Sequence, residues 1–99
     1  EFQGEGVWEV TFTSERKEHY AIFDSRGNWL GTRTLISRSL LPVKIWEHLK
    51  INFIKPDFLK IIQLNMPQGQ YYELDIYDGS KLIHLYYDGK GVLHNKGVI

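Results

Sequence analysis

The feature that most constrains the fold of this 99-residue chain is an internal repeat. The segment Trp8-Glu9-Val10-Thr11-Phe12 recurs as Tyr72-Glu73-Leu74-Asp75-Ile76, 64 positions later, and the same offset aligns Asp-x-x-Gly segments at 24–27 and 88–91 without a gap. Two unrelated hairpins can share such a pattern by chance. A gapless match over about 20 residues favours two copies of one structural unit, which we place at about residues 8–30 and 72–94.

The second copy predicts a β-hairpin in detail. Apolar and polar side chains alternate on both sides of Asp78-Gly79, and Asp-Gly is a strong signal for a two-residue type I′ turn. This turn would place Glu73 opposite His84 and Tyr71 opposite Tyr86. The aliphatic side chains would then form the core face. The opposite face would carry Tyr71, Glu73, Tyr77, His84 and Tyr86, together with Tyr20 from the first copy, whose own turn falls at residues 14–17.

The two Asp-x-x-Gly segments predict turns that each lead into another strand. The aspartate side chain caps such a turn, and the glycine supplies the left-handed backbone conformation. A calcium site would require many more oxygen ligands than one aspartate per loop. We therefore interpret residues 24–27 and 88–91 as structural corners.

One helix is predicted between the two copies, at about residues 42–54. Pro42 suits a first helical turn, and Pro56 would end the helix. Apolar side chains at helical spacing form a single stripe between the two prolines. Because the helix has one stripe, it can cover only one face of a sheet. Further strands are expected at 28–36 and 58–65.

The predicted fold is α+β, one domain spanning residues 1–99, in which an antiparallel β-sheet carries one helix on one face. The expected order is strand–strand–strand–helix–strand–strand–strand. The side chains expected to be largely buried are Trp8, Val10, Phe12, Phe23, Ile45, Trp46, Leu49, Phe53, Leu74, Ile76, Ile83 and Leu85.

Charge and composition exclude several classes of function. Twelve basic residues balance twelve acidic ones, so the chain lacks the basic excess typical of nucleic-acid binders. No apolar run reaches the roughly 18–20 residues that a membrane-spanning helix needs. Without cysteine, disulfides, thiol catalysis and thiolate metal ligands are excluded. The four histidines are scattered with no pair at metal-ligand spacing, so we expect no bound metal and no cofactor.

Glu73 and His84 are the one candidate pair for catalytic chemistry. Opposed on neighbouring strands, they could act as an acid/base couple, or they could form an exposed cross-strand pair of about 0.2–1 kcal/mol. No phosphate-binding glycine loop and no nucleophile elbow accompany them. We favour the structural interpretation and expect no catalytic residue and no enzymatic activity.

Short motifs spread over about residues 7–95 carry a family resemblance. They are Trp8-x-Val10-x-Phe12, Tyr20-Ala21-x-Phe23-Asp24-x-x-Gly27-x-Trp29-Leu30, Leu41-Pro42, Tyr72-Glu73-Leu74 and Leu85-x-Tyr87-Asp88-x-x-Gly91-x-Leu93. Together they resemble the PepSY-like family, also described as β-lactamase-inhibitor-like. The resemblance implies an antiparallel sheet backed by helices, often built from repeats, in periplasmic or secreted proteins of Gram-negative bacteria. This chain departs from the family in lacking a second helix after Val92-Leu93, and the family brings no catalytic residues.

Two classes of function fit these observations. A non-enzymatic, exported binding or inhibitor-like module would use the open sheet face, because tyrosines bury much area and keep a polar tip; the same tyrosines could instead be merely half-buried. A small-ligand-binding protein or an enzyme would need a pocket between helix and sheet. We favour the first class, with a protein, a peptide or a second copy of the chain as partner. The predicted binding residues are Tyr20, Tyr71, Glu73, Tyr77, His84 and Tyr86.

Overall fold

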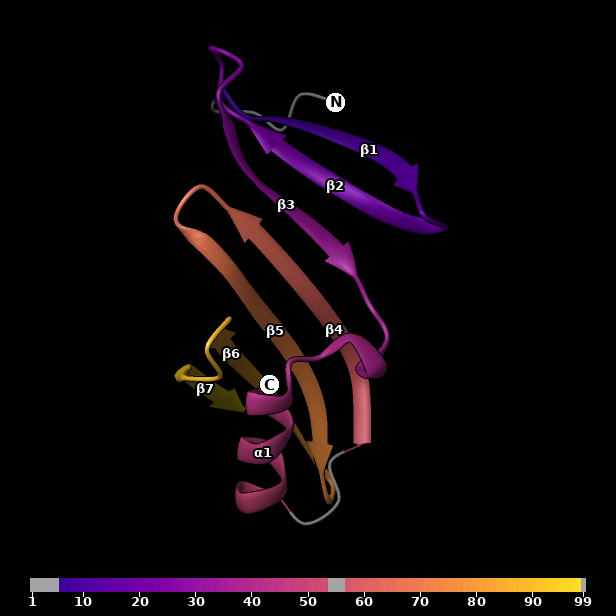
Figure 1. Ribbon diagram of the computed structural model, residues 1–99, viewed down its shortest axis with the longest axis vertical. Helices are drawn as coiled ribbons and strands as arrows, with labels where there is room; N and C mark the ends of the chain where they lie inside the picture. Colours follow the sequence, from indigo (N-terminus) through magenta and orange to yellow (C-terminus); the bar gives the residue numbers. More distant parts are fainter. Residues whose placement is uncertain (1–5, 54–56, 99) are drawn as a thin grey trace.

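The computed structural model describes residues 6–53 and 57–98, which form a seven-stranded antiparallel sheet and one α-helix (Figure 1). The strands lie in the sheet in their chain order, from β1 at one edge to β7 at the other. The α+β class is therefore confirmed. The strands are β1 (Trp8–Ser14), β2 (Lys17–Phe23), β3 (Trp29–Leu35), β4 (Asp57–Met66), β5 (Gly69–Asp78), β6 (Lys81–Asp88) and β7 (Leu93–Val98), and helix α1 (Val43–Asn52) follows a 3₁₀ turn at Arg38–Leu40.

The predicted strand count was one too low. Six strands were expected, whereas the described residues contain a seventh, β7, after the second Asp-x-x-Gly corner. Its sequence, Leu-His-Asn-Lys-Gly-Val, has little intrinsic strand preference because asparagine, lysine and glycine are depleted in strands. Pairing with β6 forms this strand, just as β3 forms on β2 after the first corner.

The two repeat copies share their pairing register. Trp8 pairs with Phe23 in the β1–β2 hairpin, and the residues 64 positions later, Tyr72 and Tyr87, pair in the β5–β6 hairpin. The register of the next strand pair shifts at equivalent places, between residues 22 and 23 in one copy and between residues 86 and 87 in the other. The offset of 64 therefore describes the pairing as well as the sequence.

Both Asp-x-x-Gly corners are turns with the same hydrogen bonds, as predicted. The backbone N–H of Gly27 donates to the carbonyl of Asp24 over 3.0 Å, and that of Gly91 donates to the carbonyl of Asp88 over 3.1 Å. Each aspartate carboxylate also accepts two backbone N–H groups, those of residues 26 and 28 in one corner and of residues 90 and 92 in the other. Each carboxylate thus satisfies backbone donors of its own turn.

The loop of the second hairpin lies one residue later than predicted. Gly79 and Ser80 form the loop, so that Asp78 pairs with Lys81. Gly79 has a φ of 66°, and Ser80 has no positive φ. Glycine at the first central position with a positive φ there alone is the pattern of a type II′ turn, not the predicted type I′ turn.

This shift corrects the predicted cross-strand pairs. Glu73 lies opposite Tyr86 instead of His84, and Tyr71 lies opposite Asp88 instead of Tyr86. Each partner moves by two residues along the facing strand, which is one full period of side-chain alternation. Every side chain therefore stays on its predicted face, although its neighbour changes.

The core lies between α1 and strands β4 to β6. Helix residues Ile45 and Leu49 are fully buried, and they cluster with strand residues from the same face of the sheet. The nitrogen Nδ1 of His48 lies 2.7 Å from the hydroxyl of Tyr87, a hydrogen bond that ties α1 to β6. Seven predicted core residues are confirmed as buried: Ile45, Leu49, Phe53, Leu74, Ile76, Ile83 and Leu85.

Helix α1 is shorter than predicted. It begins at Val43 with Pro42 as the capping residue, and Phe53 caps its other end; residue 54 lies outside the described residues. Trp46 is half-buried and packs edge-on against the Phe58 ring, with centroids 5.4 Å apart. Within residues 6–53 and 57–98, no helix has both the length and the apolar character needed to cross a membrane.

The first copy lacks the cover that α1 gives the second. Trp8, Val10 and Phe12 were predicted to be buried but are 46%, 45% and 42% exposed, and Phe23 is half-buried. Figure 1 shows the reason, since α1 lies beside β4 to β7 while β1 and β2 extend away from it. The described residues hold no second helix for this half of the sheet, so its equivalent apolar positions, with Trp29, remain partly exposed.

Candidate functional site

The predicted binding residues lie on one face of the sheet. In β5 and β6, buried side chains packed toward α1 alternate with side chains on the opposite face, which we call the open face. Tyr20 pairs with Arg33, Arg33 with Leu64, and Leu64 with Tyr71, and this continuous row places Tyr20 on the open face too. The face therefore carries all six: Tyr20, Tyr71, Glu73, Tyr77, His84 and Tyr86.

Two tyrosines form an aromatic cluster near the start of β5 and the end of β6. The rings of Tyr71 and Tyr86 are stacked, with centroids 5.6 Å apart and planes 5° apart, although the two residues are diagonal neighbours in the pairing. The His94 ring meets Tyr86 edge-on at 6.3 Å. Partial burial, followed by the nearby Tyr71 and Glu73, raises the pKa of Tyr86. The cluster is thus a half-buried aromatic surface on the open face.

The polar pair on this face is Asp75 and His84. The two are directly opposite in the pairing, and Nδ1 of His84 lies 2.6 Å from a carboxylate oxygen of Asp75. In the described part of the chain, His84 has no second side-chain hydrogen bond, and Glu73 is not its partner. Among residues 6–53 and 57–98, no nucleophilic side chain is hydrogen-bonded to the imidazole as the third member of a catalytic triad would be.

The remaining tyrosines differ in their surroundings. The hydroxyl of Tyr20 donates a 2.7 Å hydrogen bond to the carboxylate of Glu18, and this bond, together with the charge of Glu18, raises the pKa of Tyr20. Tyr77 is 38% exposed near the hairpin loop. The open face therefore combines one stacked pair with two separate tyrosines, of which Tyr77 is exposed and Tyr20 is half-buried.

A hollow of about 400 Å³ lies on the open face over β1 to β4, and neither Glu73 nor His84 lines it. It does not lie between helix and sheet, where an enclosed site for the predicted acid/base pair would have been expected. Among residues 6–53 and 57–98, no three histidine, aspartate or glutamate side chains gather closely enough to hold a metal ion.

Sequence reasoning did not select Asp75, His94, Arg33 or Lys60 as site residues. The sequence places Asp75 on this face but pairs it with Leu82, and Arg33 was interpreted as solvated surface. The pairing of Asp75 with His84 was not predicted because the loop was placed on Asp78-Gly79. The repeat contained the correction, because the first-copy turn at residues 14–17 corresponds to residues 78–81, with Gly79 and Ser80 at the centre. Arg33 and Lys60 carry no such signal, since only the strand order brings them together.

Comparisons with known proteins agree with this architecture. A family described as "Putative beta-lactamase-inhibitor-like, PepSY-like" matches residues 6–95. A BLIP-like protein from Bacteroides fragilis has a TM-score of 0.84 at 18% identity, over 99% of this chain and 72% of that one. A protein from Bacteroides eggerthii, described among "putative periplasmic proteins", has a TM-score of 0.86 at 11% identity, over 99% and 74%. The comparison with curated proteins gave no match.

Proposed function

The chain belongs to the β-lactamase-inhibitor-like, PepSY-like family, and on this premise we propose that it is a non-enzymatic, exported binding module whose open face engages a protein partner. The observation that supports this most is the stacked pair Tyr71 and Tyr86 on a sheet face that α1 does not cover. Tyrosines in such a position are enriched at interfaces because they bury much area while their hydroxyls stay hydrated.

The comparisons add support of two kinds. A similar fold is described as BLIP-like in one relative, which favours an inhibitor-like role, that is, binding to another protein without chemistry. Another similar fold is described as periplasmic, which favours a periplasmic or secreted location for this chain. The open face is broad, with residues from β2 to β6, as an interface with a folded protein requires.

The test is the double variant Tyr71→Ala/Tyr86→Ala. A matched control is Val43→Ala/Ile51→Ala, which trims two side chains of α1 that are 70% and 83% exposed and lie away from the open face. Both variants are compared with wild type for folding by circular dichroism, and for association by sedimentation velocity and by pull-down from a periplasmic extract.

The tyrosine variant should stay folded and bind its partner at least tenfold more weakly, since aromatic residues at an interface centre contribute about 2 kcal/mol or more. The control should bind as wild type does. Unchanged association in the folded tyrosine variant would refute the proposed function.

A further inference from the structure

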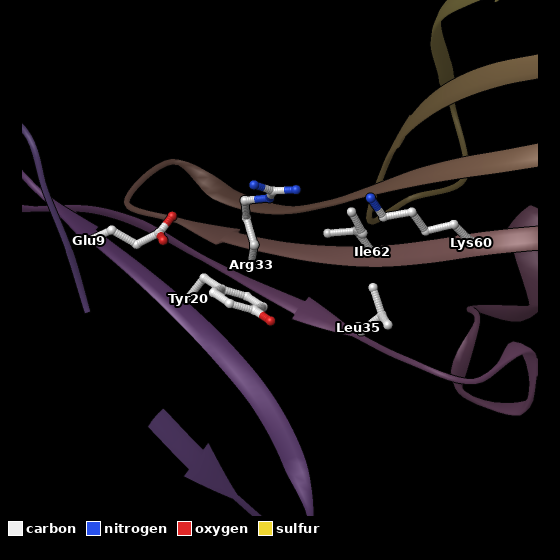
Figure 2. Close-up of a pocket in the computed structure, with 6 residues that line it drawn as sticks. All are labelled: Glu9, Tyr20, Arg33, Leu35, Lys60 and Ile62. Atoms are coloured by element: carbon white, nitrogen blue, oxygen red, sulfur yellow. The ribbon is translucent and has the colours of Figure 1, made fainter. Parts of the chain in front are cut away.

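The hollow on the open face has a mixed apolar and charged lining. Figure 2 shows Glu9 and Tyr20 at one end, Lys60 at the other, and Arg33, Leu35 and Ile62 between them. Ile62 is only 4% exposed although it lies on the uncovered side of the sheet, whereas Leu35 is 53% exposed. The hollow therefore offers an apolar floor and an accessible apolar wall.

The register explains how β2, β3 and β4 contribute to this hollow. Tyr20 lies directly opposite Arg33, and Leu35 lies directly opposite Ile62. The β2–β3 pairing ends at His19 and Thr34, so β2 does not pair with β3 beside Leu35. A bulge in β4 between Phe58 and Lys60 then sets Lys60 opposite Asp75.

Two cations, Arg33 and Lys60, line the hollow. Among the described residues, neither Arg33 nor Lys60 has an acidic oxygen within ion-pair distance. Asp75 faces Lys60 across the strands, but its carboxylate is bound to His84 at 2.6 Å. In Figure 2 the ammonium group of Lys60 extends over Ile62 toward Arg33, so two cations border the apolar surface, and the Glu9 carboxylate lies at the Tyr20 end of the hollow.

We propose that this hollow, from here on called the groove, binds an acidic side chain, flanked by an apolar one, in an extended segment of the protein partner. A carboxylate placed between the guanidinium of Arg33 and the ammonium of Lys60 gains two charge-assisted hydrogen bonds. The neighbouring apolar side chain packs on Leu35 and Ile62. Charge complementarity of this kind sets the register and the specificity of an interface more than its total affinity.

The location of the groove favours a protein over a small molecule. Arg33 continues through Leu64 to Tyr71 in a single row of the sheet, so the groove and the tyrosine cluster form one continuous surface. A small carboxylate would fill the groove alone, whereas a protein segment reaches both. The inference thus rests on the proposed function and adds the chemistry of the partner.

The test uses Arg33→Gln/Lys60→Gln with a control of equal charge change, Arg26→Gln/Lys50→Gln, whose two cations are exposed and lie on a corner and on α1. Short fluorescein-labelled peptides that alternate leucine with glutamate, or leucine with glutamine, are titrated by fluorescence anisotropy at low and high salt. Wild type and control should prefer the glutamate peptide about fivefold at low salt, as two exposed ion pairs predict. The preference should fall at high salt and be absent in Arg33→Gln/Lys60→Gln.

The following results overturn the inference. The first is equal binding of the two peptides by wild type, or a preference that survives in Arg33→Gln/Lys60→Gln. The second is octanoate competing as strongly as the peptide, which would identify a small amphiphile as the occupant. If Tyr71→Ala/Tyr86→Ala no longer binds the protein partner while Arg33→Gln/Lys60→Gln binds it as wild type does, the proposed function stands and only the role of the groove is rejected. If instead only Arg33→Gln/Lys60→Gln loses binding to the partner, the role of the groove stands and the tyrosine-centred interface is rejected.

Discussion

The repeat supplies a pair of glycines that differ in one physical respect. Gly27 and Gly91 are equivalent corner residues with φ values of 84° and 85°. A Cβ atom on Gly27 would meet nothing within 4 Å, whereas a Cβ atom on Gly91 would lie 2.5 Å from the Cβ and 3.0 Å from the carbonyl carbon of Lys44 in α1. The second corner therefore permits the close approach of the helix, and the first has no helix to accommodate.

The free energies of unfolding of Gly27→Ala and Gly91→Ala should differ for this reason. Alanine in a left-handed conformation costs about 1–2 kcal/mol in either corner. At Gly91 the backbone of α1 must also move, which adds about 1–3 kcal/mol of overpacking. We expect losses of about 1–2 kcal/mol for Gly27→Ala and about 2–5 kcal/mol for Gly91→Ala.

Equilibrium unfolding in urea measures both variants against wild type. With a slope of about 1–3 kcal/mol/M for small proteins, the difference should appear as a clearly lower midpoint for Gly91→Ala at an unchanged slope. Equal losses in the two variants would show that α1 does not press on the second corner, and would refute the reasoning from the close contact.

Three further predictions concern stability. Leu74→Ala should cost about 2–5 kcal/mol in urea unfolding because Leu74 is fully buried, while its repeat counterpart Val10→Ala, 45% exposed, should cost less than about 1 kcal/mol; similar losses would mean that both copies are covered. Burial raises the pKa of Tyr87 from 10.0 to about 12, so its stabilising contribution is complete below pH 10 and is lost as the pH rises toward 12. The free energy of unfolding of Tyr87→Phe should therefore fall less steeply than that of wild type between pH 10 and 12. The same pH dependence in both proteins would contradict this. Glu15 and Arg16 have φ values of 53° and 64°, so Glu15→Asn/Arg16→Gly should raise the melting temperature by relieving about 1–2 kcal/mol of strain, and an unchanged or lower melting temperature would argue against strain.

The faces of the strands were predictable from sequence, but their partners were not. Alternation of period two assigned Leu74 and Tyr71 to opposite faces whatever the register. The choice between Asp78-Gly79 and Gly79-Ser80 as the loop depended on a turn preference of small energy, and the wrong pairing of Glu73 with His84 followed from it. The first-copy turn, at the equivalent position, was the better guide.

Burial in the first copy could not be predicted from its own residues. Val10 and Leu74 occupy equivalent positions, yet one is 45% exposed and the other fully buried. The difference arises because α1 packs on the second copy. Which half of the sheet the helix covers is set by tertiary packing, and the alternating pattern around Val10 carries no information about it. The groove was missed for a similar reason, since Arg33 and Lys60 meet only through the pairing of β3 with β4.

Hydroxyl-radical footprinting of side chains tests the central claim, that the open face is the binding surface, most directly. The protein is oxidised alone and in complex with the partner recovered from a periplasmic extract, and protection is read by mass spectrometry. The account predicts protection of Tyr20, Tyr71 and Tyr86, while Trp8 and Phe12 on the exposed half of the opposite face stay as reactive as in the free protein. Protection of Trp8 and Phe12 with unchanged tyrosines would contradict it and place the interface on the face opposite the open face, in the half that α1 does not reach.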